Sequence, residues 1–204
     1  MRTPTRLLVA RHGDAEYAVH GVLSDDGGWL TDKGRSQAAE LATTLRDRGV
    51  TAVYTSRMDR AVQTGQVAAG VLGVGERVIA GLQEYAVGDL AGVPYNDPRA
   101  QRVFNAWLAD DLDVGIPGGE TGHEVVDRVR DALDDIADAH PGETVLVVSH
   151  GGVMSLVIPR LSDNVRNDLA AKRFLPNCVP AEVDVARDRW QVISWPGSTD
   201  KSAV

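Results

Sequence analysis

Leu7-Leu8-Val9-Ala10-Arg11-His12-Gly13 is the stretch of this chain that says most about its fold. Its first four residues form a short apolar run of the kind found in a buried strand. The three residues that follow have chemical uses: histidine can be a nucleophile, arginine can grip a phosphate with two parallel hydrogen bonds, and glycine lets backbone come close. The stretch therefore predicts an α/β protein whose reacting groups follow its first strand.

Length and composition limit the classes of protein to which the chain can belong. Its 204 residues are enough for one domain, and no apolar run approaches the ~20 residues that span a bilayer. The apolar run after Arg6 is too short for a signal peptide, so a cytoplasmic location is expected. A net charge of −8 argues against nucleic acid or a membrane surface as partner.

Cysteine usage and side-chain spacing give no reason to expect a metal or another cofactor. Cys178 is the only cysteine, which excludes an intrachain disulfide and a cysteine-based metal cage. No carboxylates and histidines recur at the spacing of metal ligands. A homodimer is left open.

Strand and helix patterns alternate along the chain. Strands are expected at residues 7–10, 51–55, 78–80 and 144–149, helices within 29–49, 59–72, 121–140 and 151–161, and a final hairpin at 183–186 and 190–194. Thr31 is the expected N-cap of the first helix, and Thr121 with Glu124 forms a capping box for a later one. Such alternation predicts a mostly parallel sheet covered by helices on both faces.

One segment interrupts this alternation. Residues 81–120 are rich in glycine and proline and contain a single short helical stretch near 101–108, which is typical of a lid or functional loop. The chain is thus interpreted as one domain, residues 1–204, with a lid-like insertion at about 81–120. The small polar tail, residues 197–204, is expected to be disordered.

Three predicted strand ends carry reactive or basic residues: Arg11-His12-Gly13, residues 56–60, and His150-Gly151-Gly152. In an open parallel sheet these ends meet at one edge, where ligands bind. Two histidines with two arginines suit phosphoryl transfer, with His12 as nucleophile and Arg11 and Arg60 gripping the phosphate oxygens. His150 would add a donor, and the acid that protonates the leaving group is expected in the lid, at Glu84.

The chain resembles the histidine phosphatase superfamily, the clan of phosphoglycerate mutases and acid phosphatases. The matching stretches occur in the family's order between about residues 7 and 160: Arg11-His12-Gly13, Leu30 to Ala38, Tyr54 to Thr64, Leu82-Gln83-Glu84 with Gly88 and Gly92, Pro117 to Thr121, and Val147 to Gly152.

This resemblance implies a three-layer α/β/α sandwich and a metal-independent reaction. It implies that His12 carries the phosphoryl group, that Arg11, Arg60 and His150 form the phosphate pocket, and that Glu84 donates the proton. Gly13 and Gly151, which follow the two histidines, are expected to line the substrate pocket.

The chain departs from the family pattern in its first loop. Ala15 and Ala18 stand where the family has a threonine and a phosphate-binding asparagine, and residues 19–28 contain no arginine or lysine. Because a mutase must bind highly anionic bisphosphoglycerate, a phosphomonoester hydrolase acting on a small phosphorylated metabolite is favoured. A mutase of the same mechanism and a non-catalytic phospho-ligand-binding module are the alternatives, and the physiological substrate is left open.

Overall fold

A single mixed sheet of six strands organises the residues that the computed structural model describes, which are 3–170, 175–186 and 189–196. The strands lie in the order β5-β4-β6-β1-β7-β8. Neighbours from β5 to β1 pair in parallel, whereas β7 and β8 are antiparallel additions beside β1. Their bounds are β1 (Thr5–Arg11), β4 (Val50–Thr55), β5 (Gly75–Val78), β6 (Thr144–Ser149), β7 (Pro180–Ala186) and β8 (Arg189–Ser194).

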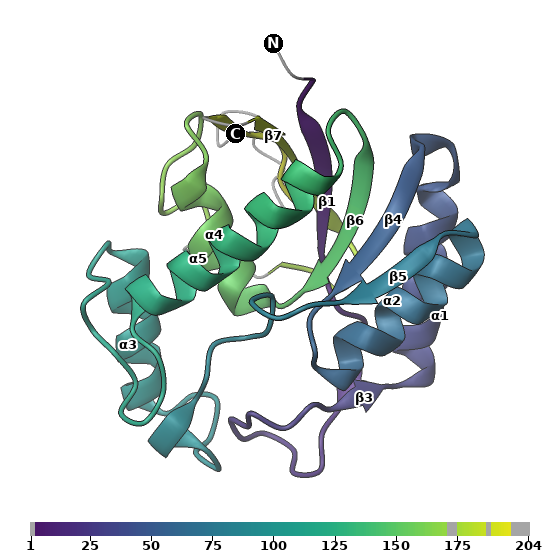
Figure 1. Ribbon diagram of the computed structural model, residues 1–204. Coiled ribbons are helices and arrows are strands. Elements are labelled where there is room, and N and C mark those ends of the chain that lie inside the picture. Colours follow the sequence, from purple (N-terminus) through teal and green to yellow (C-terminus); the bar gives the residue numbers. More distant parts are fainter. Residues whose placement is uncertain (1–2, 171–174, 187–188, 197–204) are drawn as a thin grey trace.

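Helices cover both faces of this sheet (Figure 1). Helices α1 (Asp32–Thr44) and α2 (Asp59–Leu72) pack on one face, and α4 (Gly122–Ala139) and α5 (Gly151–Leu161) on the other. Because side chains alternate along a strand, Leu8 and Ala10 of β1 join the core under α1 and α2, while Leu7 and Val9 join the core under α4 and α5. The predicted three-layer sandwich with a mostly parallel sheet is confirmed.

Local sequence signals set the helix ends. The Thr31 side chain accepts a hydrogen bond from the Gly34 N–H at the start of α1, as expected of an N-cap. Thr121 and Glu124 form the predicted capping box at the start of α4. After α1 the chain makes one short 3₁₀ turn, η1 (Arg46–Arg48), and leaves it through Gly49 in the left-handed conformation.

The strands differ from the sequence prediction at several places. Residues 29–30, which precede the predicted N-cap Thr31, form a short strand that was not predicted, β3 (Trp29–Leu30), and it pairs antiparallel with β2 (Ala15–Glu16). Strand β7 begins three residues before the predicted 183–186. Strand β5 begins at Gly75 rather than at residue 78, since it is a largely exposed edge strand without the apolar pattern that marks buried strands.

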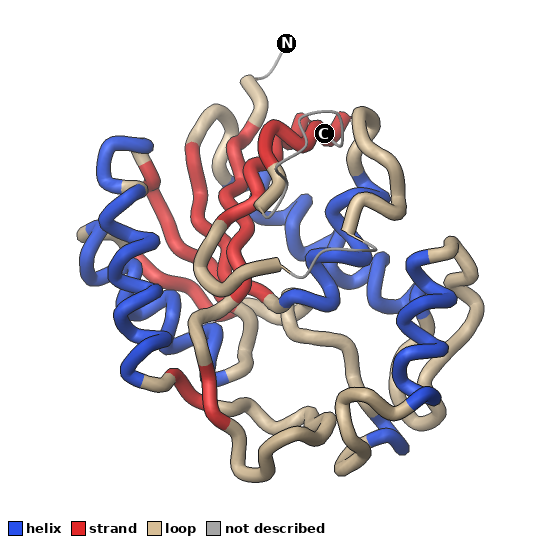
Figure 2. The backbone as a smooth tube through the Cα atoms, turned by 180° about the vertical axis from the view of Figure 1, so that it is seen from behind, coloured by secondary structure: helices blue, strands red, loops and turns tan. Residues whose placement is uncertain are grey.

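The glycine-rich segment 81–120 contains one 3₁₀ turn, η2 (Gly88–Leu90), and helix α3 (Pro98–Leu108), which starts three residues before the helical stretch expected there. Both α3 and β3 lie in the lower half of Figure 1, at the end of the sheet where β1 and β6 finish, and Figure 2 shows the same arrangement from behind. The predicted hairpin turn at 187–188 and the tail 197–204 lie outside the described residues.

Candidate active site

The three predicted strand ends meet at one edge of the sheet. Because β1, β4 and β6 are parallel and adjacent, Arg11 lies opposite Ser149, and Thr55 lies opposite Val148. Backbone hydrogen bonds continue one residue beyond β1 and β4: the His12 N–H donates to the carbonyl oxygen of Ser149 at 3.0 Å, and the Ser56 N–H donates to that of Val148 at 3.1 Å. His12, Ser56 and His150 are thus the first residues past three neighbouring strands. The expected convergence of these side chains is confirmed.

The backbone of the next residue holds His12 in one tautomer. Its ring is 4% exposed, and Nδ1 lies 2.7 Å from the carbonyl oxygen of Gly13. A carbonyl oxygen can only accept, so Nδ1 carries the hydrogen and Nε2 keeps its lone pair. Nε2 accepts a hydrogen bond from Nε of Arg60 at 3.1 Å. The nitrogen with nucleophilic character therefore faces the arginine that was expected to bind phosphate.

The environment of His12 keeps its ring uncharged. Burial lowers the pKa of His12 to about 3, and the positive charges of Arg60 and Arg11 disfavour a second positive charge beside them. The Gly13 carbonyl acts in the opposite direction but is outweighed. At neutral pH the lone pair of Nε2 is available without prior loss of a proton.

Arg60 and Arg11 contribute positive charge from two different elements. Arg60, in the first turn of α2, is 4% exposed and also donates from Nη1 to the carbonyl oxygen of Gly27. Arg11, the last residue of β1, donates from Nη1 to the carbonyl oxygen of Leu175 at 3.1 Å. Each guanidinium has five N–H donors, so these contacts leave further donors for an oxyanion.

His150 offers a second hydrogen-bond donor at the same edge. Its ring is fully buried, and its centroid lies 5.2 Å from that of His12. Burial first, and then the nearby charge of Arg60, lower the pKa of His150 well below its usual range, so the ring is neutral. A neutral imidazole still carries one N–H, so His150 can supply the donor that the sequence analysis expected.

Ser56 determines which nitrogen of His150 carries that hydrogen. Ser56 Oγ lies 2.7 Å from Nε2 of His150 and accepts from the Met58 N–H at 3.3 Å. Its hydroxyl hydrogen has no other hydrogen-bond acceptor among the described residues, so we assign that hydrogen to Nε2. Nδ1 of His150 then bears the ring hydrogen, and it has no hydrogen-bond partner among the described residues. A buried donor without a partner is costly, and a ligand oxygen would satisfy it.

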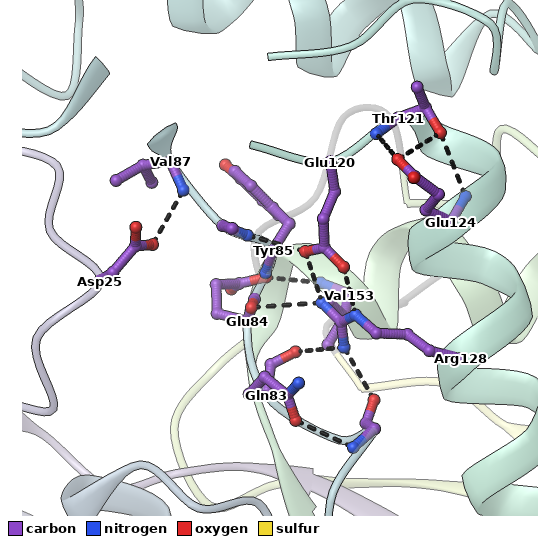
Figure 3. Close-up of polar contacts among 12 residues, drawn as sticks. Asp25, Gln83, Glu84, Tyr85, Val87, Glu120, Thr121, Glu124, Arg128 and Val153 are labelled. Atoms are coloured by element: carbon purple, nitrogen blue, oxygen red, sulfur yellow. Dashed lines mark hydrogen bonds and ion pairs between the residues drawn. The ribbon is translucent and has the colours of Figure 1, made fainter. Parts of the chain in front are cut away.

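Glu84 reaches the site through α5. Its carboxylate oxygens accept hydrogen bonds from the N–H groups of Gly152 and Val153, each at 2.9 Å. These residues lie two and three positions after His150, and Figure 3 shows the contact with Val153. Gly152 must lack a side chain here, because a Cβ would approach Glu84 Oε1 to 2.6 Å. The predicted acid therefore lies at the same sheet edge as the two histidines, bound to a helix N-terminus.

The two glycines predicted to line the pocket, Gly13 and Gly151, have different surroundings. Gly13 donates its N–H to Thr64 Oγ1 at 3.0 Å, and a Cβ there would lie 2.6 Å from the carbonyl oxygen of Gly34. It packs the first loop against α1 and orients His12. Gly151 is the first residue of α5, beside the Arg11 side chain.

Sequence reasoning missed several residues that support the site. Thr64 fixes Gly13, Asn177 donates from Nδ2 to the carbonyl oxygen of His12 at 2.6 Å, and Ser56 orients His150. Thr64 could have been found from its position four residues after Arg60, one helical turn away. Asn177 had no local signal, because it comes from far along the chain. Ala18, at the family's asparagine position, is exposed in the first loop.

Other features lie away from this edge or are not seen. A hollow of about 160 Å³ is lined by Thr3, Asp134 and Asp138, among others, and by none of the predicted site residues. Within the described residues, no three histidine, cysteine or carboxylate side chains are arranged to hold a metal ion. Nor is any described helix both long and apolar enough to cross a membrane.

Comparison with known proteins shows to which family this chain belongs. The family model of the histidine phosphatase superfamily (branch 1) matches residues 7–197. Phosphoglycerate mutase-like protein 4 from Arabidopsis thaliana is 32% identical over 93% of this chain and 84% of its own length. The metal-independent phosphoserine phosphatase of the same plant is 30% identical over 98% of this chain and 84% of its own.

Solved structures agree with the sequence comparison. A mycobacterial glucosyl-3-phosphoglycerate phosphatase, solved in complex with VO3, has a TM-score of 0.79 and 25% identity, covering 97% of this chain and all of its own. The match of the family model to nearly the whole chain, on a sheet edge that gathers the arginines and histidines described above, leads to one conclusion: this chain belongs to the histidine phosphatase superfamily (branch 1).

Proposed function

We propose that the protein is a metal-independent phosphomonoester hydrolase that acts on a small phosphorylated metabolite through a phosphohistidine at His12. The observation that carries the proposal is the state of His12: a buried, neutral imidazole with its Nε2 lone pair beside Arg60 and its Nδ1–H held by Gly13. Relatives whose names include phosphoserine phosphatase and glucosyl-3-phosphoglycerate phosphatase support the same reaction type.

Binding of the phosphate group would exchange partners at Arg60. Its Nε–H, which now occupies the lone pair of His12, would turn to a phosphate oxygen and free Nε2 for attack. Arg11 and the Nδ1–H of His150 would bind further oxygens, so that charge developing on the phosphoryl group meets preorganised donors.

The chemistry would then proceed in two balanced steps. Nε2 of His12 forms a bond to phosphorus while the bond from phosphorus to the leaving oxygen breaks, and that oxygen takes a proton from Glu84. Water next attacks the phosphohistidine, the bond from phosphorus to nitrogen breaks, and the Glu84 carboxylate takes the proton of the water. The products are an alcohol and inorganic phosphate, and both His12 and Glu84 return to their starting states.

The lack of positive charge in the first loop and in the lid segment that pairs with it favours hydrolysis over mutase chemistry. The first loop pairs with the segment 87–95: the Leu23 N–H donates to Val93, the Gly92 N–H to Leu23, and the Val87 N–H to a carboxylate oxygen of Asp25. No lysine or arginine occurs in residues 12–32 or in residues 78–98, which include these two segments. A mutase must hold a second anionic group, for which these two segments supply no positive charge.

Rapid-quench analysis tests the proposal directly. The wild-type enzyme, mixed with ³²P-labelled p-nitrophenyl phosphate, should accumulate an acid-labile, base-stable adduct, and His12→Ala should lose the adduct and nearly all turnover. Turnover should persist in EDTA, because the arginines supply the positive charge and His150 supplies a further hydrogen-bond donor. Full activity of His12→Ala, or activity in EDTA that returns only with a divalent ion, would contradict the mechanism. Absence of any turnover would instead favour the phospho-ligand-binding module.

A further inference from the structure

Arg128 and Glu120 form an ion-paired clamp. Neither the sequence motifs nor the proposed reaction gives these two residues a role. Arg128 lies in α4, and Glu120 lies two residues before that helix. Arg128 Nε and Nη2 donate to the two carboxylate oxygens of Glu120 at 2.5 and 2.9 Å, which is the parallel, two-bond geometry of a strong arginine–carboxylate pair. Both side chains are shielded, with 18% and 20% of their area exposed.

The remaining donors of Arg128 all bind the chain that carries Glu84 (Figure 3). Nη1 donates to the carbonyl oxygens of Gly81 and Gln83 at 2.7 and 2.8 Å, and Nη2 donates to the carbonyl oxygen of Glu84 at 3.2 Å. One guanidinium thus fixes three carbonyl groups within four residues.

Glu120 completes the clamp on the far side of Glu84. Its Oε2 accepts a hydrogen bond from the N–H of Ala86 at 2.8 Å. Glu120 takes no part in capping α4, because Glu124 provides the carboxylate of the capping box. Glu120 is therefore free to bind Arg128 and Ala86, and the pair holds the backbone before, at and after Glu84.

The close approach of this segment to α4 has a steric requirement. Gly81 has a φ of +92°, and a Cβ there would lie 2.8 Å from both the carbonyl oxygen of Arg128 and the Cβ of Ala132. The chain can lie within reach of Arg128 because residue 81 has no side chain. Glu84 is consequently held from two sides, its backbone by the clamp on α4 and its carboxylate by the N-terminus of α5.

We propose that Arg128 and Glu120 are positioning residues that hold the Glu84 carboxyl group where it can give a proton to the leaving oxygen. The inference rests on the proposed function, because it takes Glu84 as the acid. The pair is neutral overall and its hydrogen-bonding groups are used within the clamp, so it acts through geometry rather than through contact with phosphate. A misplaced acid should slow only those reactions in which the leaving oxygen needs a proton.

The test is the dependence of kcat/KM on the leaving group. Benzyl phosphate releases an alkoxide that needs protonation, and p-nitrophenyl phosphate releases a stable phenolate that does not. Arg128→Met removes every hydrogen bond that the guanidinium makes and leaves only the bond between Glu120 and Ala86, and Glu120→Gln keeps the shape while weakening the pair. We expect Arg128→Met to lose at least about 10-fold on benzyl phosphate and less than about threefold on p-nitrophenyl phosphate, with a smaller loss of the same pattern for Glu120→Gln.

Matched controls separate this role from a purely structural one. Arg130 lies on the same helix and pairs at the surface with Asp127 and Asp131, so Arg130→Met should leave both rates unchanged. Circular dichroism and melting temperature confirm that each variant is folded. If Arg128→Met does not fold, the isosteric Glu120→Gln decides the matter. Equal losses on both esters in a folded variant, or no loss on either, would overturn the inference.

Glu84→Gln, assayed in parallel, shows which assumption has failed. If Glu84→Gln slows both esters equally, Glu84 is not the acid, and both that assignment and this inference fall. If Glu84→Gln slows benzyl phosphate selectively while the clamp variants do not, the acid assignment stands and only the positioning role of Arg128 and Glu120 is wrong.

Discussion

At the scale of single residues, the protonation states of the two histidines decide what the site can do. His12 and His150 are both buried beside Arg60, and both are neutral for that reason. His12 therefore presents a lone pair, and His150 presents a single N–H at Nδ1. Two identical side chains have opposite hydrogen-bonding roles because Gly13 accepts from one ring and Ser56 donates to the other.

Replacement of Ser56 tests this division of roles. Ser56→Ala should free Nε2 of His150 to take the hydrogen, so that the donor at Nδ1 is lost in part of the population, and kcat/KM for p-nitrophenyl phosphate should fall by about 10-fold, or ~1.4 kcal/mol. Nitrogen NMR of the labelled ring should show the change of tautomer. Ser162→Ala removes another buried hydroxyl, bonded to Ile158, and should leave kcat/KM unchanged. An unaltered His150 tautomer in Ser56→Ala would refute the assignment.

At the scale of elements, the first loop pairs with residues 87–95 of the lid, although the two segments are far apart in sequence. Tyr17 from the first loop lies with its ring 5.4 Å from the Arg60 guanidinium, and Tyr95 comes from the partner segment. Burial raises the pKa of Tyr95, the Tyr17 phenol raises it further, and Arg60 lowers it, so Tyr95 as well as Tyr17 lies within the field of Arg60. The two paired segments thus offer aromatic surface near the site and no basic side chain.

This lid composition predicts discrimination by charge. Benzyl phosphate and 4-carboxybenzyl phosphate differ mainly in a carboxylate on the leaving group. We expect the wild-type enzyme to favour benzyl phosphate by at least about 10-fold in kcat/KM, because the two paired segments place no cation beside the carboxylate. Tyr95→Arg should reduce this preference, and the uncharged Tyr95→Gln should not. Equal kcat/KM values for both esters in the wild-type enzyme would show that a cation elsewhere binds the carboxylate.

At the scale of the whole molecule, burial of uncharged histidines links stability to pH. The folded state holds the pKa of His12 at about 3, below the ordinary 6.5, so between these values the unfolded chain binds a proton that the folded chain does not. Stability is then complete above about pH 6.5 and falls as the pH decreases. The buried His150, whose pKa is lowered in the same direction, adds to this loss.

Urea unfolding at pH 7 and pH 5 measures this linkage. His12 should account for roughly 2 kcal/mol of the decrease in the free energy of unfolding between these two pH values. His12→Asn removes the titrating group, so its free energy of unfolding should change less than that of the wild type over the same range, whatever its absolute stability. The same decrease in both proteins would show that His12 is charged, or exposed to solvent, in the folded state.

The order of elements and the family could be predicted from short stretches of sequence. Helix α2 and strand β6 have the predicted bounds, and the caps at Thr31 and Thr121 form as expected, because these signals lie within a few residues. The predicted enzyme class is confirmed by the family match and by relatives named as phosphatases. The short strand β3 and the start of β5 could not be predicted, because pairing with a neighbouring strand, not local pattern, defines them.

The sequence by itself determined which groups would gather at the sheet edge, because parallel strands bring Arg11, His12 and His150 to the same end. Only the tertiary structure decided the state of those groups. The neutral rings depend on burial and on Arg60, and the backbone of Glu84 is hydrogen-bonded to Arg128. Hydrogen bonds between residues far apart in the chain leave no periodic or local trace in sequence. The strands could therefore be predicted one at a time, but the working geometry of the site arises only when they pack together.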